Sequence, residues 1–140
     1  MAIPLPTFTP DHLHPILVNF TAALVPASVG SDVLGRALRK PSMHTAAWWM
    51  VLYAAAVTPL TVLSGLWWKH GEKDMLPPKL IAEHQWLGIG LAVCFVVLAV
   101  WRFGIYKRNV PPSVAYLILG IVLVAALVVQ GALGGQMLLG

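Results

Sequence analysis

Histidines are the side chains of this sequence best suited to chemistry, and four of the five fall on the same side of a set of long apolar segments. His12 and His14 stand at the start of the first segment, His70 follows the second, and His84 comes early in the third. An imidazole can bind a metal or carry a proton near neutral pH. Ionisable groups at such places are costly to bury, so their presence indicates a site.

His14 and His84 form the most promising pair. If consecutive segments run antiparallel, the starts of the first and third lie at the same level, and the two imidazoles can face each other. Two facing imidazoles supply the axial ligands of a six-coordinate haem b. Small residues that fall at this depth could leave room for a flat porphyrin: Thr61, Gly65, Gly88, Gly131 and Gly135. We therefore expect haem b, with His14 and His84 on the iron.

Other interpretations of these residues stay open. His70 or His12 could replace His14 as the partner of His84. Glycines in membrane helices commonly serve close packing, which leaves a bundle with no cofactor. Covalent c-type haem attachment requires a Cys-x-x-Cys-His motif, and Cys94 is the only cysteine.

Some side-chain amides inside the apolar segments need hydrogen-bond partners. Among them are Asn19, which could bond to Thr58 or Thr61, and Gln130 and Gln136 near the end of the fourth segment. Bonds between helices satisfy such amides in most membrane proteins. A quinone headgroup is the alternative ligand for them.

The elements that position these residues follow from composition. The 140 residues are 59% hydrophobic and 10% charged, with a mean hydropathy of +0.80, which excludes a soluble enzyme and a disordered chain. Four stretches are long and apolar enough to cross a bilayer as helices: residues 15–38, 45–68, 79–101 and 113–139. We expect an all-α, polytopic membrane protein, with one antiparallel bundle of four transmembrane helices over residues 1–140.

The basic residues predict an orientation. The first and third connections carry six of them, Arg36, Arg39, Lys40, Arg102, Lys107 and Arg108, against Lys69, Lys73 and Lys79 at the opposite end. The positive-inside rule then places the first set in the cytoplasm and both termini in the periplasm, across a bacterial inner membrane. In this arrangement His44 is a solvated residue beside a basic connection. The net charge of +4 is explained by membrane orientation and does not indicate nucleic-acid binding.

Several motifs resemble a bacterial membrane-protein family, the domain of unknown function 2231. They are the stretch from His14 to Phe20, His84 early in the third helix, and the ending from Gly131 to Gly135. The family's first motif reads His-Pro-x-x-Val-His-Phe-Pro, so Asn19 replaces its second histidine and Thr21 its following proline. Family members usually continue beyond the paired glycines with a tyrosine and another histidine. The resemblance implies the four-helix layout and no particular activity.

Together these observations predict a b-type cytochrome-like protein that transfers single electrons. So little mass outside the bilayer favours a small subunit of a respiratory or photosynthetic membrane complex over an enzyme acting by itself. A cofactor-free assembly subunit and a quinone- or metal-interacting membrane protein are the alternatives. No nucleophile, phosphate-binding loop or catalytic carboxylate pair stands out in the sequence.

Overall fold

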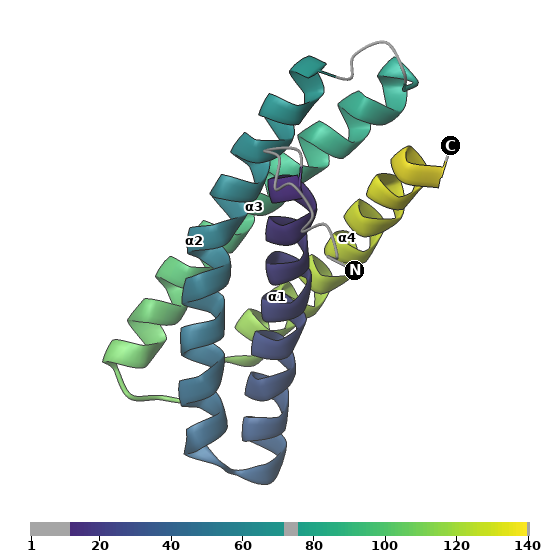
Figure 1. The fold of residues 1–140 in the computed structure, drawn as a ribbon. Coiled ribbons are helices and arrows are strands. Elements are labelled where there is room, and N and C mark those ends of the chain that lie inside the picture. Colours follow the sequence, from purple (N-terminus) through teal and green to yellow (C-terminus); the bar gives the residue numbers. More distant parts are fainter. Residues whose placement is uncertain (1–11, 72–75, 140) are drawn as a thin grey trace, which may run out of the picture.

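Four long helices make up the computed structural model, which describes residues 12–71 and 76–139, without the side chains of residues 70, 71, 138 and 139. The helices are α1 (Leu13–Leu38), α2 (Pro41–Gly71), α3 (Pro78–Lys107) and α4 (Val114–Leu139). Each is long and apolar enough to cross a membrane. The expected all-α, four-helix membrane fold is confirmed (Figure 1).

Two of the helices extend further than the sequence predicted, α2 at its start and α3 at its end. We expected the second helix over 45–68 and the third over 79–101, whereas α2 already begins at Pro41 and α3 continues to Lys107. Pro41 suits a first turn because proline has no amide hydrogen to lose there. α3 continues past Trp101 because Arg102 has a buried partner inside the bundle, described below, and need not leave it.

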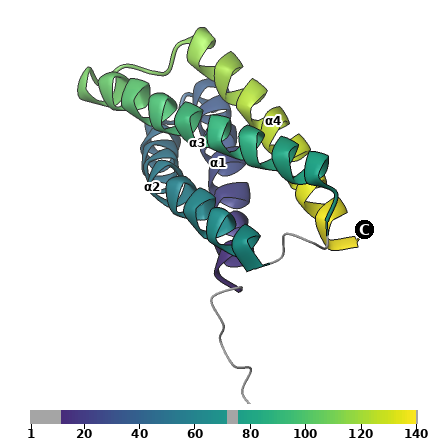
Figure 2. The same ribbon diagram turned by 90° about the horizontal axis from the view of Figure 1, so that it is seen from above.

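The helices pack in chain order around the bundle. α1 packs against α2, α2 against α3 and α3 against α4, and α4 closes the ring against α1. Figure 2 shows α1 between α2 and α4. α1 and α3 therefore begin at one end of the molecule, and α2 and α4 begin at the other (Figure 1).

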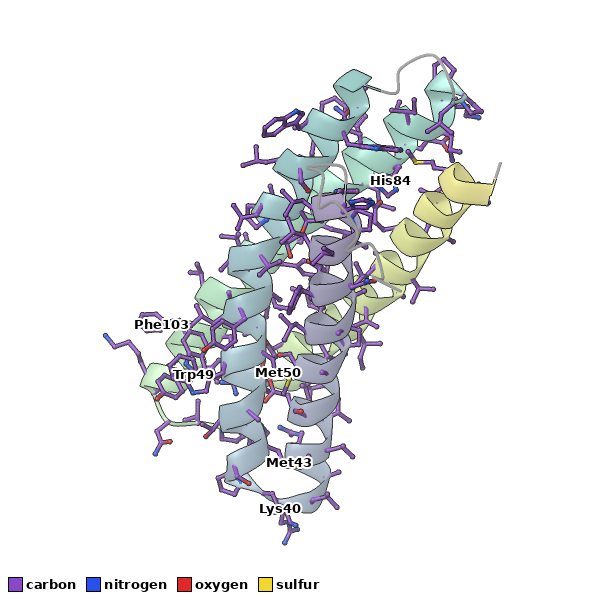
Figure 3. All side chains as sticks on the ribbon, in the orientation of Figure 1. Lys40, Met43, Trp49, Met50, His84 and Phe103 are labelled. Carbon is purple, nitrogen blue, oxygen red and sulfur yellow. The ribbon has the colours of Figure 1, made fainter. Side chains whose placement is uncertain are left out.

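We name the two ends after the residues that distinguish them. The histidine end holds His14 and His84, and the arginine end holds Asp32, His44 and Arg102. His84 lies at the opposite end of the bundle from Lys40 (Figure 3). α1 and α2 join at the arginine end through Arg39 and Lys40, and Arg39 adopts a left-handed conformation with a φ of 54°.

Large apolar side chains cover both the interior and the exterior of this bundle. Val25, Val51, Phe95 and Leu98 are fully buried in the core. Many others are exposed on the outside, such as Val100, which is 67% exposed. Trp49 and Phe103 also project outward (Figure 3). An exterior of this kind is stable in lipid and not in water.

Candidate functional site

His14, in the first turn of α1, is held by α2. Its Nδ1 lies 3.0 Å from the carbonyl oxygen of Thr61 and 3.1 Å from Oγ of Ser64. A carbonyl oxygen only accepts hydrogen bonds, so Nδ1 carries the proton and donates it. The neutral ring then has its lone pair on Nε2. An imidazole whose Nδ1 donates to a backbone carbonyl has the form in which histidine binds metals.

His84, early in α3, is held by α4 in a different way. The amide nitrogen of Gln130 donates to the His84 carbonyl at 3.0 Å and lies 3.3 Å from His84 Nε2. An amide nitrogen only donates, so Nε2 accepts this long hydrogen bond and Nδ1 carries the proton of the neutral ring. Nδ1 of His84 and Oε1 of Gln130 are both buried, and neither has a hydrogen-bond partner among the residues that the structure describes. The histidine end thus has an unpaired donor beside an unpaired acceptor.

The structure brings the two expected imidazoles to the same end of the bundle. Each ring is anchored by a helix that is not its own, α2 for His14 and α4 for His84.

The small residues play a more specific part than the sequence suggested. A Cβ built on Gly65 would lie 2.8 Å from Cε1 of His14, and one on Gly134 would lie 3.2 Å from Cε1 of His84. A Cβ on Gly88 would lie 2.9 Å from the amide nitrogen of Gln130. These three glycines make room for the site's own side chains.

The remaining small residues surround the histidine end more loosely. A Cβ on Gly131 or Gly135 would have no atom of residues 12–71 or 76–139 within 4 Å. Thr61 contributes its carbonyl to His14, while its hydroxyl donates to the carbonyl of Val57 at 3.1 Å.

The other histidines of this end are less well placed. His12 immediately precedes α1 and is exposed. The His70 side chain and Lys73 lie outside the described residues. Within the part of the chain that the structure describes, no three His, Cys, Asp or Glu side chains come together to hold a metal ion.

The arginine end carries a second polar cluster, which the sequence interpretation missed. Arg102 donates from Nε to Oδ2 of Asp32 and from Nη2 to Oδ1, both at 3.1 Å. Nη2 also donates to the carbonyl oxygen of His44 at 2.7 Å, and His44 Nδ1 donates to Oδ1 of Asp32 at 2.8 Å. Asp32 is 0% exposed and Arg102 is 2% exposed. The cluster joins α1, α2 and α3 through one buried carboxylate.

Three sequence-based assignments are therefore wrong. Arg102 is not a connection residue but a buried one within α3, because Asp32 compensates its charge. His44 is not merely solvated, since it bonds to Asp32 and its ring packs against Gly35. Asn19 is exposed on α1, and the hydroxyl of Thr58 bonds to Thr21 instead. A carboxylate inside a predicted membrane helix was the signal that could have revealed the cluster.

A comparison with protein families places the fold in a known group. Residues 10–139 match the model of a family described as a predicted membrane protein, DUF2231. The chain belongs to the DUF2231 family. None of the curated proteins and none of the solved structures matches it. The DUF2231 match confirms the resemblance seen in the sequence, and the geometry of the two ends has to carry any argument about function.

Proposed function

We propose that this DUF2231 protein binds one haem b at the histidine end and transfers single electrons. The supporting observation is that two imidazoles, from α1 and α3, lie at the same end of the bundle and are each held by a hydrogen bond to a neighbouring helix. Haem brings its own four equatorial nitrogens, so two histidines suffice. A bare zinc or copper ion would need more ligands than this pair supplies.

The two rings fit this role to different degrees. His14 already has its lone pair on Nε2, the usual ligating nitrogen, and needs no rearrangement. His84 has to release the Gln130 amide before its Nε2 can reach a metal. When bound, the haem would supply one-electron redox chemistry. The chain's part is to hold the imidazoles neutral and oriented, through the Thr61 carbonyl and the space at Gly65 and Gly134.

The cellular setting proposed is a small subunit of a respiratory or photosynthetic complex in a bacterial inner membrane. Arg102 no longer counts toward orientation because it is buried. The arginine end still has five basic residues, Arg36, Arg39, Lys40, Lys107 and Arg108, against three at the other end, Lys69, Lys73 and Lys79. This excess supports a cytoplasmic arginine end, and a histidine end and termini facing the periplasm.

A visible spectrum of protein purified from cells supplied with a haem precursor tests the proposal. We expect a Soret band, with sharp α and β bands on reduction. His14→Ala and His84→Ala should each abolish or convert the low-spin signal. His44→Gln is the matched control, because it alters a histidine of the arginine end and should keep the spectrum. Folded, colourless wild-type protein would overturn haem binding.

A quinone headgroup is the second candidate, favoured by the unpaired atoms at His84 and Gln130. A quinol hydroxyl can accept from Nδ1 of one and donate to Oε1 of the other, which satisfies both at once. Solvent extraction of the purified protein followed by chromatography would detect a bound quinone. Gln130→Leu should remove the quinone and leave any haem spectrum in place, so the two candidates separate.

A further inference from the structure

An apolar groove opens on the outer surface of the bundle, between α2 and α3. It lies between Pro59, Val62 and Leu63 of α2 and the part of α3 from Ile89 to Val97, and its volume is about 420 Å³. Sites for small molecules in proteins commonly have volumes of about 300–1,000 Å³. We call this feature the outer groove, and it has the size of a ligand site.

The outer groove faces the surroundings of the bundle and is lined only by hydrocarbon. At its rim Leu63 is 62% exposed and Val93 is 60% exposed, whereas Ala92 is 8% exposed and forms part of its floor. The single methyl group of Ala92 leaves a depth that a larger side chain would fill. Since the side chains that line the groove have no polar atom, the part of a ligand that fits into it is a hydrocarbon chain.

A polar bridge joins α2 to α3 beyond the groove, toward the histidine end. Nζ of Lys69 donates to Oε1 of Gln85 at 2.7 Å. Lys69 follows Val62 by seven residues, and Gln85 precedes Ile89 by four. With 3.6 residues per helical turn, the bridge therefore lies one to two turns beyond the groove, across the same pair of helices.

Two exposed tryptophans indicate the depth of this bridge in the membrane. Trp67 is 72% exposed and Trp86 is 68% exposed, and they are close in sequence to the two bridge residues. Tryptophans of membrane helices are enriched at the level of the lipid headgroups. Ile89 and Val97 lie about 6 and 18 Å along α3 from Gln85. The groove thus extends through the adjacent half of a hydrocarbon layer that is about 30 Å thick.

Lys69 brings a positive charge to this level, and no carboxylate in residues 12–71 or 76–139 pairs with it. Its amino group bonds to the neutral amide of Gln85. The carboxylates that form ion pairs within those ranges are Asp32, at the arginine end, and Glu83, which pairs with Lys79. An ammonium group has three donors, so Lys69 can hold Gln85 and an anionic group at the same time.

We propose that the outer groove is a binding site for an anionic phospholipid, with the phosphate at Lys69 and one acyl chain between α2 and α3. This site goes beyond the proposed electron transfer and does not depend on haem. The acyl chain, held by the apolar lining, gives an affinity that all phospholipids share. Lys69 adds a preference for headgroups with a net negative charge.

Native mass spectrometry of the full chain in mild detergent tests the proposal. Delipidated protein is titrated with dioleoyl phosphatidylglycerol, or with dioleoyl phosphatidylcholine, which has the same acyl chains and no net charge. We expect the anionic lipid to bind about fivefold more tightly, the effect of one lysine near a charged headgroup. Lys69→Gln should remove this preference.

Lys79→Gln is the matched control for the charge. It makes the same change at the same end of the bundle, but Lys79 is 88% exposed, pairs with Glu83, and lies about 9 Å beyond Gln85 along α3, away from the groove. The preference for the anionic lipid should be unchanged in this variant.

A second pair of variants tests the groove itself. Ala92→Leu fills the floor and should weaken the binding of both lipids by about tenfold, the value of two buried methylene groups. Ala125→Leu makes the same substitution on the exposed side of α4 and should bind as the wild type does. Circular dichroism checks that both variants are folded, and Lys69→Gln leaves the groove lining intact.

Three results would overturn the proposal: equal affinity of the wild type for the two lipids, an equal loss in Lys69→Gln and Lys79→Gln, or undiminished binding in folded Ala92→Leu. A dimer in the same spectra that Ala92→Leu dissociates would also overturn it, because a second copy of the chain would then occupy the groove.

Discussion

The two ends of this bundle both bury polar side chains in an apolar surrounding, but only one of them is complete. At the arginine end, Asp32 accepts hydrogen bonds from Arg102 and His44, and Arg102 also reaches a carbonyl. At the histidine end, His84 Nδ1 and Gln130 Oε1 are buried without partners in the described part of the chain. Buried polar groups are almost always paired. A complete cluster fits a structural role for the arginine end, whereas an incomplete one supports the proposal that the histidine end binds a ligand.

The largest effect should come from breaking the arginine end. Asp32→Ala leaves the Arg102 guanidinium buried and uncompensated, which we expect to destabilise the fold by about 3–5 kcal/mol. Unfolding in mixed detergent micelles, followed by circular dichroism, measures this loss. Replacing both partners together, as Asp32→Leu with Arg102→Met, should recover most of the stability, because no bare charge remains. A double variant as unstable as Asp32→Ala would show that the ion pair itself is required.

An intermediate effect is expected at Gly65. Gly65→Ala places a methyl group 2.8 Å from Cε1 of His14, so the ring has to move from the Thr61 carbonyl, at a cost of about 1–3 kcal/mol. Gly90→Ala is the matched control, since a Cβ there meets nothing within 4 Å. It should stabilise α3 by up to about 1 kcal/mol, the difference in helix propensity. Equal stabilities for the two variants would contradict this account of Gly65.

The smallest effect on stability is expected from a substitution of Gln130 at the histidine end. Gln130→Leu removes one amide that is already half unpaired, so we expect the free energy of unfolding to change by less than about 1 kcal/mol. The same unfolding measurement detects it. A loss as large as that of Asp32→Ala would mean that Gln130 is fully paired, and the histidine end would then be as complete as the arginine end.

The sequence was sufficient to predict the four helices, because a long apolar segment in a membrane has few ways other than a helix to pair its backbone hydrogen-bonding groups. It also placed His14 and His84 at one end, since antiparallel connectivity alone determines that level. It could not identify the Thr61 carbonyl as the partner of His14, because every residue has a carbonyl. That partner depends on how α1 is rotated against α2.

The arginine end shows what a count of charges misses. From the sequence, Arg102 looks like a connection residue because it follows the end of an apolar segment. In the structure it lies within α3, which continues to Lys107, and it pairs with Asp32 inside the bundle. Asp32 and Arg102 are 70 residues apart. A pair this distant in sequence is recognised from the three-dimensional arrangement and not from local spacing.

That separation has a consequence for how the protein is made. Chains are synthesised from the N-terminus, so Asp32 leaves the ribosome long before Arg102 exists. His44 follows Asp32 by only 12 residues, so it is made before Arg102 and is the first of these two hydrogen-bond partners of the carboxylate. The hairpin of α1 and α2, and not α1 alone, is therefore the smallest piece of the nascent chain that holds both Asp32 and one of these two partners.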